Sequence, residues 1–415
     1  MIQPMRIAWF SPLPPTRSGI SAYSAELLPH LERRYVVDAF DERAAYDFAW
    51  THRRTPYDLV VYHLGNARCH DYIWAYLAAY PGLVVLHDAR LHHARASLLL
   101  QSKREGDYRR EFWYDHPDAR KNVVEYAVAG LAGPIYYFWP MTRVVVETAR
   151  LVAVHNESVA RELRETYPNR EVETIRMGVP EPRVDMTAAA AVRARFGIAD
   201  KAIVFAAFGK ATAEKRIGAI ERAIGALAAI GYDVHLLIVG ERDASLMLLS
   251  ELGAPRLANR VHVTGYVADE DVATYLAASD VCLCLRWPTA LETSASWLRC
   301  IAAARATIVS DLAHTADVPA SVARRVDLIA EDESLLNAMR ELAADKAARD
   351  AVARAGHEWW KAHHTMDAMA EDYHRILDRA VTCPAPKVSD LPAHFVDDYS
   401  DAARAIAIQY GISWP

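Results

Sequence analysis

The most polar junction in the sequence follows the strand-like run "VCLCLR", where an apolar stretch gives way to an Ala-rich segment. Glu292, Thr293 and Ser294 stand at the expected start of the next helix, and Thr289 lies just before them. The hydroxyl groups and free backbone N–H groups of a helix start favour an anion such as a phosphate. A carboxylate does not suit the anion itself, so we expect Glu292 to accept hydrogen bonds from sugar hydroxyls beside it. The alternative is that Glu292 only complements the helix dipole, because acidic residues are common in first turns.

A second chemical signal is the run "FGKATAEKRIG", which holds Gly209, Lys210, Lys215 and Arg216 between an expected strand and an expected helix. Three cations around a helix N-terminus are unfavourable with the helix dipole unless an anion lies between them. This arrangement therefore predicts a phosphate site. The alternative, a basic turn that is simply solvated, stays open.

Two more loops of this kind occur in the first part of the chain. The segment "SPLPPTRSGISAYSAEL" places Gly19 at a helix start, where the backbone can approach an anion closely. An ordinary strand-to-helix turn is the alternative there. The segment "VVLHDARLHHA" places His87 and Asp88 directly after a strand, and we expect His87 to contact substrate hydroxyls. His92 and His93 are interpreted as helix-face residues, since the spacing matches no familiar zinc site.

The elements that must position these loops form two similar series. Short apolar runs alternate with helical patterns, and runs so rich in Val, Ile and Leu are typical of parallel strands buried on both faces. The predicted strands are "RIAWFS", "LVVYHL", "GLVVLHD" and "RLVAVHN", then "AIVFAAFG", "VHLLIVGE", "RVHVTGY", "DVCLCLR" and "ATIVSDL". Two such series imply two doubly wound α/β domains. Ligands of such sheets bind outside the carboxyl ends of the strands, where all four polar loops occur.

The domain boundaries follow from the same pattern. We expect an N-terminal domain over 1–178, a C-terminal domain over 179–380 and a tail over 381–415. The Pro-rich stretch Met177–Met186 is the expected linker, because it is dominated by turn-forming residues. Helical periodicity resumes at the end in "DDYSDAARAIAIQYG", which predicts a terminal helix that packs back elsewhere on the protein.

Composition narrows the class of protein. The chain has 415 residues and a formal net charge of -6, which argues against bulk nucleic-acid binding. Its five cysteines show no disulfide or metal spacing, and we place Cys282 and Cys284 in a strand, as expected in a reducing cytoplasm. We expect no signal peptide, because the start lacks a long apolar run. The uncharged stretch Tyr126–Met141 is short for a membrane span and is interrupted by Gly-Pro, which leaves surface contact with a bilayer open.

Two familiar motifs are excluded. The dinucleotide fingerprint G-x-G-x-x-G is absent from the first loop, which argues against a nicotinamide enzyme. The acids of Asp269–Asp271 resemble an Asp-x-Asp metal motif. They stand at the start of an amphipathic helix, so we interpret them as capping and first-turn acids rather than as metal ligands.

Taken together, these segments resemble the GT-B glycosyltransferases, and in particular the retaining enzymes of family 4, over nearly the whole chain. The resemblance implies two Rossmann-like domains facing a central cleft, with a C-terminal helix that packs back toward the N-terminal domain. It implies that Gly19 lies against the donor diphosphate and that His87 meets the transferred sugar. Lys210 and Lys215 match the basic pair that grips the diphosphate.

The segment "RWPTALETSASWLRCIAAARATIVSD" resembles a bacterial subgroup that reads Pro-Thr-x-Gly-Glu-Thr-Ser-x-x-x-x-Arg, with departures. Leu291 stands where the subgroup has Gly, and Ala304 stands where a Gly often closes the helix. Arg299 occupies the position of a second Glu that usually faces the nucleotide ribose, and the first Glu is displaced by one residue to Glu292. The donor-binding residues that the resemblance implies are Gly19, Gly209, Lys210, Lys215, Arg216, Thr289, Glu292, Thr293, Ser294 and Arg299.

The predicted function is transfer of a sugar from a nucleoside diphosphate sugar to an acceptor hydroxyl, with the anomeric configuration retained. The resemblance implies a hexosyltransferase that needs no metal, no cofactor and no covalent nucleophile. Lys215 would stabilise the departing diphosphate, while His87 and Glu292 orient the sugar. The acceptor would be a glycan, a lipid-linked molecule or a small molecule. The residues expected to contact it are Asp88, Tyr108, Trp113 and Arg143.

Other functions and locations stay open. A non-catalytic sugar-nucleotide-binding protein is favoured by Arg299 and by the missing glycines. A nucleotide-sugar 2-epimerase shares the fold, but it needs a set of carboxylates and His that the sequence does not supply. We expect a cytoplasmic protein. The basic and aromatic residues between Tyr108 and Arg143 suggest peripheral contact with the inner membrane face, and helices packed over an acceptor groove are the alternative.

Overall fold

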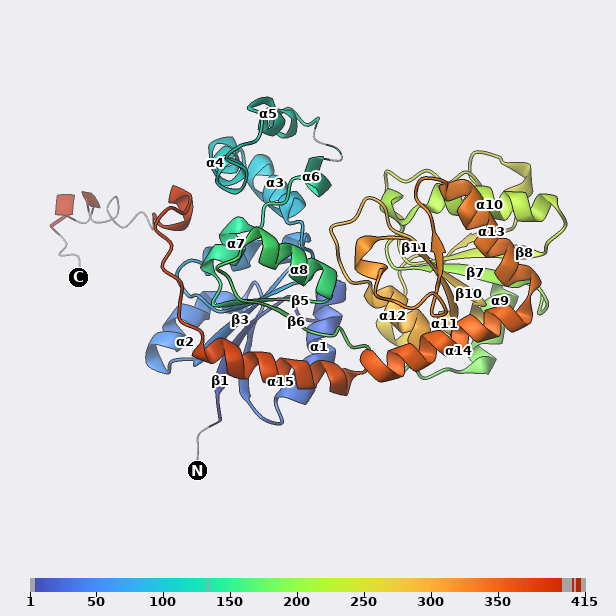
Figure 1. The fold of residues 1–415 in the computed structure, drawn as a ribbon, viewed down its shortest axis with the longest axis horizontal. Coiled ribbons are helices and arrows are strands. Elements are labelled where there is room, and N and C mark those ends of the chain that lie inside the picture. Colours follow the sequence, from blue (N-terminus) through green and yellow to red (C-terminus); the bar gives the residue numbers. More distant parts are fainter. Residues whose placement is uncertain (1–3, 132, 134, 398–404, 407, 412–415) are drawn as a thin grey trace. The chain divides into compact units, whose positions relative to one another are not determined.

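The computed structural model describes residues 4–131, 133, 135–397, 405–406 and 408–411. The chain folds as two compact units (Figure 1). The N-terminal unit holds the described residues up to Ile175, together with Ala290–Glu292 and those from Asp372 onward. The C-terminal unit holds Arg176–Thr289 and Thr293–Glu371.

The N-terminal unit is built on six parallel strands in the order β2-β1-β3-β4-β5-β6. These strands are β1 (Arg6–Phe10), β2 (Val36–Phe40), β3 (Leu59–Leu64), β4 (Leu83–Leu86), β5 (Leu151–Val154) and β6 (Val172–Thr174). Every residue of β3, β4 and β5 is buried, as expected of central strands covered on both faces. The helices between β1 and β6 are α1 (Gly19–Leu31), α2 (Phe48–Arg54), α3 (His92–Gln101), α4 (Glu105–Asp115), α5 (Asn122–Val128), α6 (Ile135–Phe138), α7 (Arg143–Thr148) and α8 (Glu157–Thr166).

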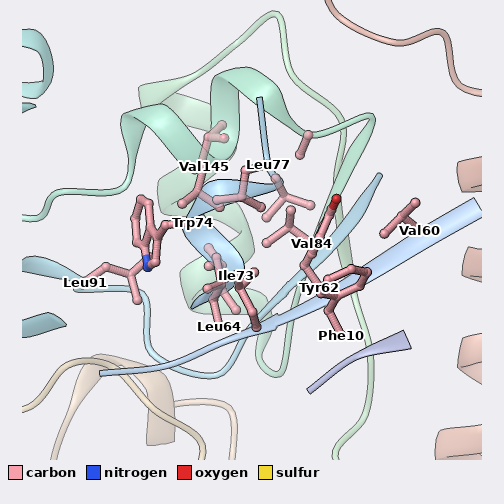
Figure 2. Close-up of a cluster of buried hydrophobic side chains, with 14 of the residues drawn as sticks. Phe10, Val60, Tyr62, Leu64, Ile73, Trp74, Leu77, Val84, Leu91 and Val145 are labelled. Atoms are coloured by element: carbon pink, nitrogen blue, oxygen red, sulfur yellow. The ribbon is translucent and has the colours of Figure 1, made fainter. Parts of the chain in front are cut away.

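An aromatic-rich core holds this sheet in place (Figure 2). The ring of Phe10, at the end of β1, lies 5.3 Å from that of Phe40, 4.9 Å from that of Phe48 and 5.1 Å from that of Tyr62, measured between ring centres. Aromatic pairs at these separations add about 0.5–1.5 kcal/mol each beyond the area they bury. The core therefore fixes the carboxyl end of β1 against the neighbouring strands.

The insertion between β4 and β5 has a small core of its own. Tyr108, Phe112 and Met141 are buried there, and Figure 1 shows α3 to α6 grouped together within the N-terminal unit. The uncharged stretch Tyr126–Met141 contributes to two short helices, α5 and α6, rather than to one long one. In the part of the chain that the structure describes, no helix is long and apolar enough to cross a membrane.

The C-terminal unit repeats the architecture with six parallel strands in the order β12-β11-β10-β7-β8-β9. They are β7 (Ile203–Phe208), β8 (Val234–Val239), β9 (Val261–Val263), β10 (Val281–Cys284), β11 (Ala306–Ser310) and β12 (Arg324–Val326). The helices are α9 (Met186–Arg195), α10 (Ile217–Ala229), α11 (Val272–Ala278), α12 (Ala295–Ala302), α13 (Glu331–Ala344), α14 (Lys346–His363) and α15 (Met366–Thr382), which joins the two units.

All nine predicted strands form, and the expected two doubly wound α/β domains are confirmed. The three strands that the sequence did not reveal, β2, β6 and β12, each lie at an edge of a sheet. Edge strands are short and more polar, so they lack the apolar runs that mark central strands. Cys282 and Cys284 lie in β10, as predicted.

The chain returns to the N-terminal unit through the second part of α15. Tyr373 places its hydroxyl oxygen 2.7 Å from that of Tyr23, and Arg375 forms an ion pair of 3.1 Å with Glu173. The expected packing of a C-terminal helix on the N-terminal domain is therefore observed. The predicted helix over 397–411 lies largely outside the described residues. The predicted linker contains neither helix nor strand before α9 begins at Met186.

At two positions where the glycosyltransferase pattern has glycine, this chain has another residue and still adopts a left-handed backbone conformation. Leu291 has φ 62° and Ala304, just after α12, has φ 52°. A side chain in this conformation costs roughly 1–2 kcal/mol, because Cβ approaches the following carbonyl oxygen. The backbone shape is thus retained although the glycine is absent.

We expect the Ala304→Gly variant to be more stable than the parent by about 1 kcal/mol, because glycine removes the left-handed strain. Ala304 is exposed, so no packing is lost. The matched control is Ala351→Gly in the middle of α14, where an exposed alanine has a helical backbone and glycine should destabilise by about 0.5–1 kcal/mol. Urea unfolding of the two variants gives the sign of each change. A loss of stability in both would contradict the strain assigned to Ala304.

Candidate functional site

The predicted site residues of the N-terminal unit lie where its parallel strands end. Parallel register pairs Leu64 of β3 with Leu86 of β4, and Leu86 with Val154 of β5. His87 and His155 each follow these paired residues directly, so they emerge beside one another at the same edge of the sheet. Their ring centres are 4.9 Å apart.

The start of α1 completes this edge. Ser18 caps the helix, and its hydroxyl oxygen accepts hydrogen bonds from the backbone N–H groups of Ile20 and Ser21 at 3.2 and 3.3 Å. A Cβ atom added to Gly19 would meet nothing within 4 Å. Packing within the protein therefore does not require glycine at this position, and the space above the first turn of α1 is open.

Four buried histidines gather behind this edge. His63 places Nδ1 3.0 Å from Nε2 of His87, while His70 donates from Nδ1 to the carbonyl oxygen of His63 at 2.8 Å. His155 donates from Nδ1 to a backbone carbonyl oxygen, that of Ile175, at 3.2 Å. The ring of His87 meets that of Tyr23 edge-on at 4.8 Å.

Burial keeps these imidazoles neutral. It lowers the pKa of His63 and of His87 well below the usual value, and neighbouring imidazoles lower both further. Burial also lowers the pKa of His70 and of His155 to about 4. His87 is thus a neutral hydrogen-bonding group rather than a cation. Sequence reasoning found His87 but missed the other three, although His63 and His155 sit at the ends of predicted strands.

Asp88 serves the loop after β3. Its Oδ2 accepts a hydrogen bond from the backbone N–H of Asn66 at 2.7 Å, and the side-chain amide of Asn66 donates to the carbonyl oxygen of Arg90 at 2.7 Å. A Cβ atom on Gly65 would lie 3.2 Å from Oδ2 of Asp88. The predicted acceptor contact of Asp88 therefore competes with a structural role that the carboxylate already has.

The other predicted acceptor residues differ in exposure. Tyr108 is completely buried and hydrogen-bonds through its hydroxyl to Nε2 of His92 at 2.5 Å, so it belongs to the core of the insertion. The prediction that Tyr108 contacts an acceptor is corrected on that ground. His92 is likewise a core residue and not a helix-face one, because it also bonds the carbonyl oxygen of Trp139. Trp113 is partly buried against the same core.

Arg143 lines a cavity of about 450 Å³ in the N-terminal unit. Its guanidinium donates to the carbonyl oxygen of Tyr114 at 2.6 Å and lies 4.4 Å from the centre of the Tyr114 ring. Its backbone N–H donates to Asp115 at 2.6 Å, and burial raises the pKa of Asp115 to about 7. Other residues around the cavity come from the loop after β4, the end of α4, α7, α8 and the turn that follows α8.

The charges around this cavity are matched in pairs. Arg90 forms an ion pair of 2.7 Å with Glu162, and Arg170 donates from Nε to Glu147 at 2.8 Å. In each pair a planar guanidinium group, which donates hydrogen bonds, lies beside a planar carboxylate, which accepts them. An anion gains little from such a cavity, whereas a neutral molecule with several hydroxyl groups can bond both members of a pair.

In the C-terminal unit the loop after β7 folds around a lysine. Gly209 has φ 82°, and Nζ of Lys215 donates to the carbonyl oxygen of Phe208. A Cβ atom at Gly209 would lie 2.8 Å from Nζ of Lys215 and 3.7 Å from Oγ of Ser296. The glycine, the ammonium group and the first turn of α12 therefore converge on one small space, and the positive φ favours glycine at this position.

The other two cations of this loop have carboxylate partners. Lys210 places Nζ 2.7 Å from Oδ2 of Asp243, and Arg216 donates from Nε to Glu331 at 2.7 Å. The expectation that an external anion must relieve all three cations is therefore wrong, because the protein supplies two carboxylates itself. The prediction that Arg216 binds the donor is not supported by this contact, since its guanidinium is held by Glu331.

The loop before α12 has the expected polar character. Ser294 caps the helix by accepting from the backbone N–H of Trp297 at 3.2 Å, and Thr289 is buried. Thr293 precedes the cap, and Arg299 lies partly buried within α12. The hydroxyl groups of these residues therefore lie around the start of α12, together with the backbone amides of its first turn.

Glu292 belongs by its contacts to the N-terminal unit. Its Oε2 accepts from the backbone N–H of Ala290 at 3.0 Å, and the carbonyl oxygen of Ala290 accepts from the backbone N–H of Ala89 at 2.9 Å. The tight turn at Leu291 thereby ties Glu292 to the loop that carries His87.

Metal ligands are a separate question. Across the described ranges, no group of three or more His, Cys, Asp or Glu side chains is arranged to hold a metal ion. Asp269–Asp271 form one turn that leads into α11, at the predicted helix start. Asp271 makes no side-chain capping bond there, contrary to the expected cap.

Residues 201–345 match the family model described as "Glycosyl transferases group 1". The matched segment lies largely within the C-terminal unit. No curated protein sequence matches the chain.

Several solved structures share the fold over most of this chain. Sucrose-phosphate synthase (tll1590) from Thermosynechococcus elongatus is 15% identical with a TM-score of 0.64, covering 90% of this chain and 98% of that one. Anabaena Alr3699/HepE in complex with UDP-glucose is 13% identical with a TM-score of 0.62, covering 90% and 100%. WaaG, a glycosyltransferase involved in lipopolysaccharide biosynthesis, is 14% identical with a TM-score of 0.61, covering 89% and 99%. The expected GT-B fold is confirmed.

The neutral histidines make the N-terminal unit sensitive to acid. Because the pKa of His70 falls from an ordinary 6.5 to about 4, its contribution to stability is present above pH 6.5 and is lost as the pH falls toward 4. We expect the parent protein to lose about 2 kcal/mol more stability between pH 7 and pH 5 than His70→Asn, which keeps an N–H donor but does not titrate. Urea unfolding at several pH values measures this difference. Equal losses would show that His70 is not buried neutral, and above pH 7 the two proteins should change in parallel.

Proposed function

We propose that this glycosyltransferase moves a hexose from a nucleoside diphosphate sugar to an acceptor hydroxyl, with retention of configuration and without a resident metal or cofactor. The observation that carries the proposal is the convergence of Gly209, Lys215 and the start of α12 on one small space. An ammonium group close to the start of a helix suits a phosphate. Solved neighbours of this fold include a complex with UDP-glucose, which supports a nucleotide-sugar donor.

Charge develops on the diphosphate as the bond to the sugar breaks. In this proposal Lys215 and the amides at Ser294 and beyond stabilise that charge, which is the main source of rate acceleration. His87 and Glu292 hold the hexose so that the acceptor attacks from the face of the leaving group. The neutral state of His87 suits this role, because a neutral imidazole binds a sugar hydroxyl without competing for the diphosphate.

We expect Lys215→Ala to lower turnover by about two orders of magnitude, as for removal of one strong electrostatic donor in other active sites. The matched control is Lys210→Ala. Its ammonium is exposed and already paired with Asp243, so its loss should cost much less. Release of UDP from UDP-glucose and of other nucleotides from their sugars, with and without acceptor, measures turnover. Near-parental turnover of Lys215→Ala would refute the assignment.

The acceptor is proposed to place a sugar unit in the cavity beside Arg143. Its volume of about 450 Å³ is in the range of small-molecule sites. Its matched Arg–carboxylate pairs favour a neutral, hydroxyl-rich ligand, such as a glycan or the sugar of a lipid-linked acceptor. For a lipid-linked acceptor, exposed Leu131 and Phe138 of the insertion provide apolar groups for contact with a membrane surface.

Filling the cavity should weaken the acceptor alone. Thr166 is exposed and lines the cavity, so we expect Thr166→Trp to raise KM for the acceptor while KM for the donor stays unchanged. Glu165→Trp adds the same bulk at the neighbouring exposed position, which does not line the cavity. Steady-state kinetics with each substrate varied separate the two constants. An unchanged acceptor KM in Thr166→Trp would remove the cavity from the acceptor site.

A further inference from the structure

His63 is placed to control the chemistry of His87. The two residues come from neighbouring strands of the sheet: His63 lies within β3, and His87 directly follows β4. Nδ1 of His63 lies 3.0 Å from Nε2 of His87, which is a hydrogen-bond distance. His63 is completely buried, while His87 keeps 7% of its surface exposed. The outer residue is therefore the one that can meet a ligand, and the inner residue holds it.

One proton lies between these two rings. Both imidazoles are buried. Burial and the neighbouring imidazoles lower the pKa of each ring, so both rings stay neutral. In a neutral pair one nitrogen donates and the other accepts. The bond therefore has two forms. Either His63 donates from Nδ1, or His87 donates from Nε2, and the two forms leave different nitrogens with a hydrogen.

Two other histidines of the cluster show which form the site favours. His70 and His155 both bond backbone carbonyl oxygens through Nδ1. A carbonyl oxygen only accepts, so both rings carry their hydrogen on Nδ1. Their Nε2 atoms are buried without a hydrogen-bond partner in the described part of the chain, and each is a bare lone pair.

Nε2 of His63 is also buried, and no described residue forms a hydrogen bond with it. If His87 donated, His63 would carry its hydrogen on this nitrogen, and a buried N–H group would lack an acceptor. Orphaned N–H groups are rarer in proteins than under-satisfied acceptors. If His63 donates instead, its Nε2 is a lone pair like those of His70 and His155. The second form fits the pattern of the cluster.

We propose that His63 donates its Nδ1–H to Nε2 of His87 and thereby fixes His87 with its own hydrogen on Nδ1. Nδ1 of His87 makes no hydrogen bond among the described residues. Resting on the proposed function, this makes His63 a positioning residue: His87 presents an N–H donor to an oxygen of the transferred sugar, and its basic nitrogen is occupied. His87 then orients the donor sugar and does not accept a proton from the acceptor.

Nitrogen NMR of protein labelled with nitrogen-15 histidine tests the assignment without any activity. The His87 signals are identified by their loss in His87→Gln. We expect Nδ1 of His87 to be the protonated nitrogen and Nε2 the unprotonated one in the parent protein at pH 7.5. A hydrogen on Nε2 of His87 would overturn the proposal.

Two variants of His63 separate positioning from packing. An Asn side chain places its amide N–H near the former Nδ1, so His63→Asn should keep the His87 tautomer and turnover within a few-fold. His63→Leu fills similar space without a donor, and we expect a mixture of His87 tautomers and a loss of turnover of about tenfold, as for one lost hydrogen bond. Equal losses in both variants, with the tautomer unchanged, would reduce His63 to a packing role.

The experiment also distinguishes failure of this inference from failure of the proposed function. The predicted tautomer with no sugar transfer from UDP, GDP, ADP or dTDP sugars would reject the transferase and keep the arrangement of the two histidines. Transfer activity with the hydrogen on Nε2 of His87 would keep the transferase and reject the role of His63. If His63→Leu does not fold, the parent spectrum and His63→Asn still decide the tautomer.

Discussion

The parallel register of β3, β4 and β5 is the constraint on which the polar edge of the N-terminal unit depends. Because Leu64, Leu86 and Val154 lie side by side, the residues around them emerge together at one edge of the sheet. The aromatic core around Phe10 holds that edge rigidly. The imidazoles are thus brought together by strand pairing, and their neutrality follows from the burial that the same pairing imposes.

In the C-terminal unit, carboxylates of the protein itself neutralise part of the positive charge before α10. The helix start at α10 carries three cations, yet Asp243 and Glu331 neutralise two of them within the protein. The ammonium group of Lys215 donates to the carbonyl oxygen of Phe208 and lies against Gly209, close to the first turn of α12. The position of each cation, rather than the number of cations, therefore decides which of them lies nearest to that helix start.

The sequence predicted the fold well, because central strands buried on both faces are continuous apolar runs that are easy to recognise. It also placed the four polar loops directly after strands, as the structure has them, while their role as ligand-binding loops stays a prediction. It did not reveal His63 and His70 as partners of His87, because their proximity arises from pairing between distant segments. Tyr108 was misplaced for a related reason: an aromatic residue among basic ones looks like a surface group until the insertion is seen to have its own core. Carboxylate partners such as Glu331, far along the chain from Arg216, were equally invisible.

Leu291 and Ala304 show that a backbone shape can persist without the residue that reaches it most easily. Both positions keep a left-handed φ although each carries a side chain. Neither residue favours that conformation by itself, so the strands, helices and hydrogen bonds around each turn must impose it. The two turns are therefore set by their surroundings, and part of the free energy of folding is spent in holding them.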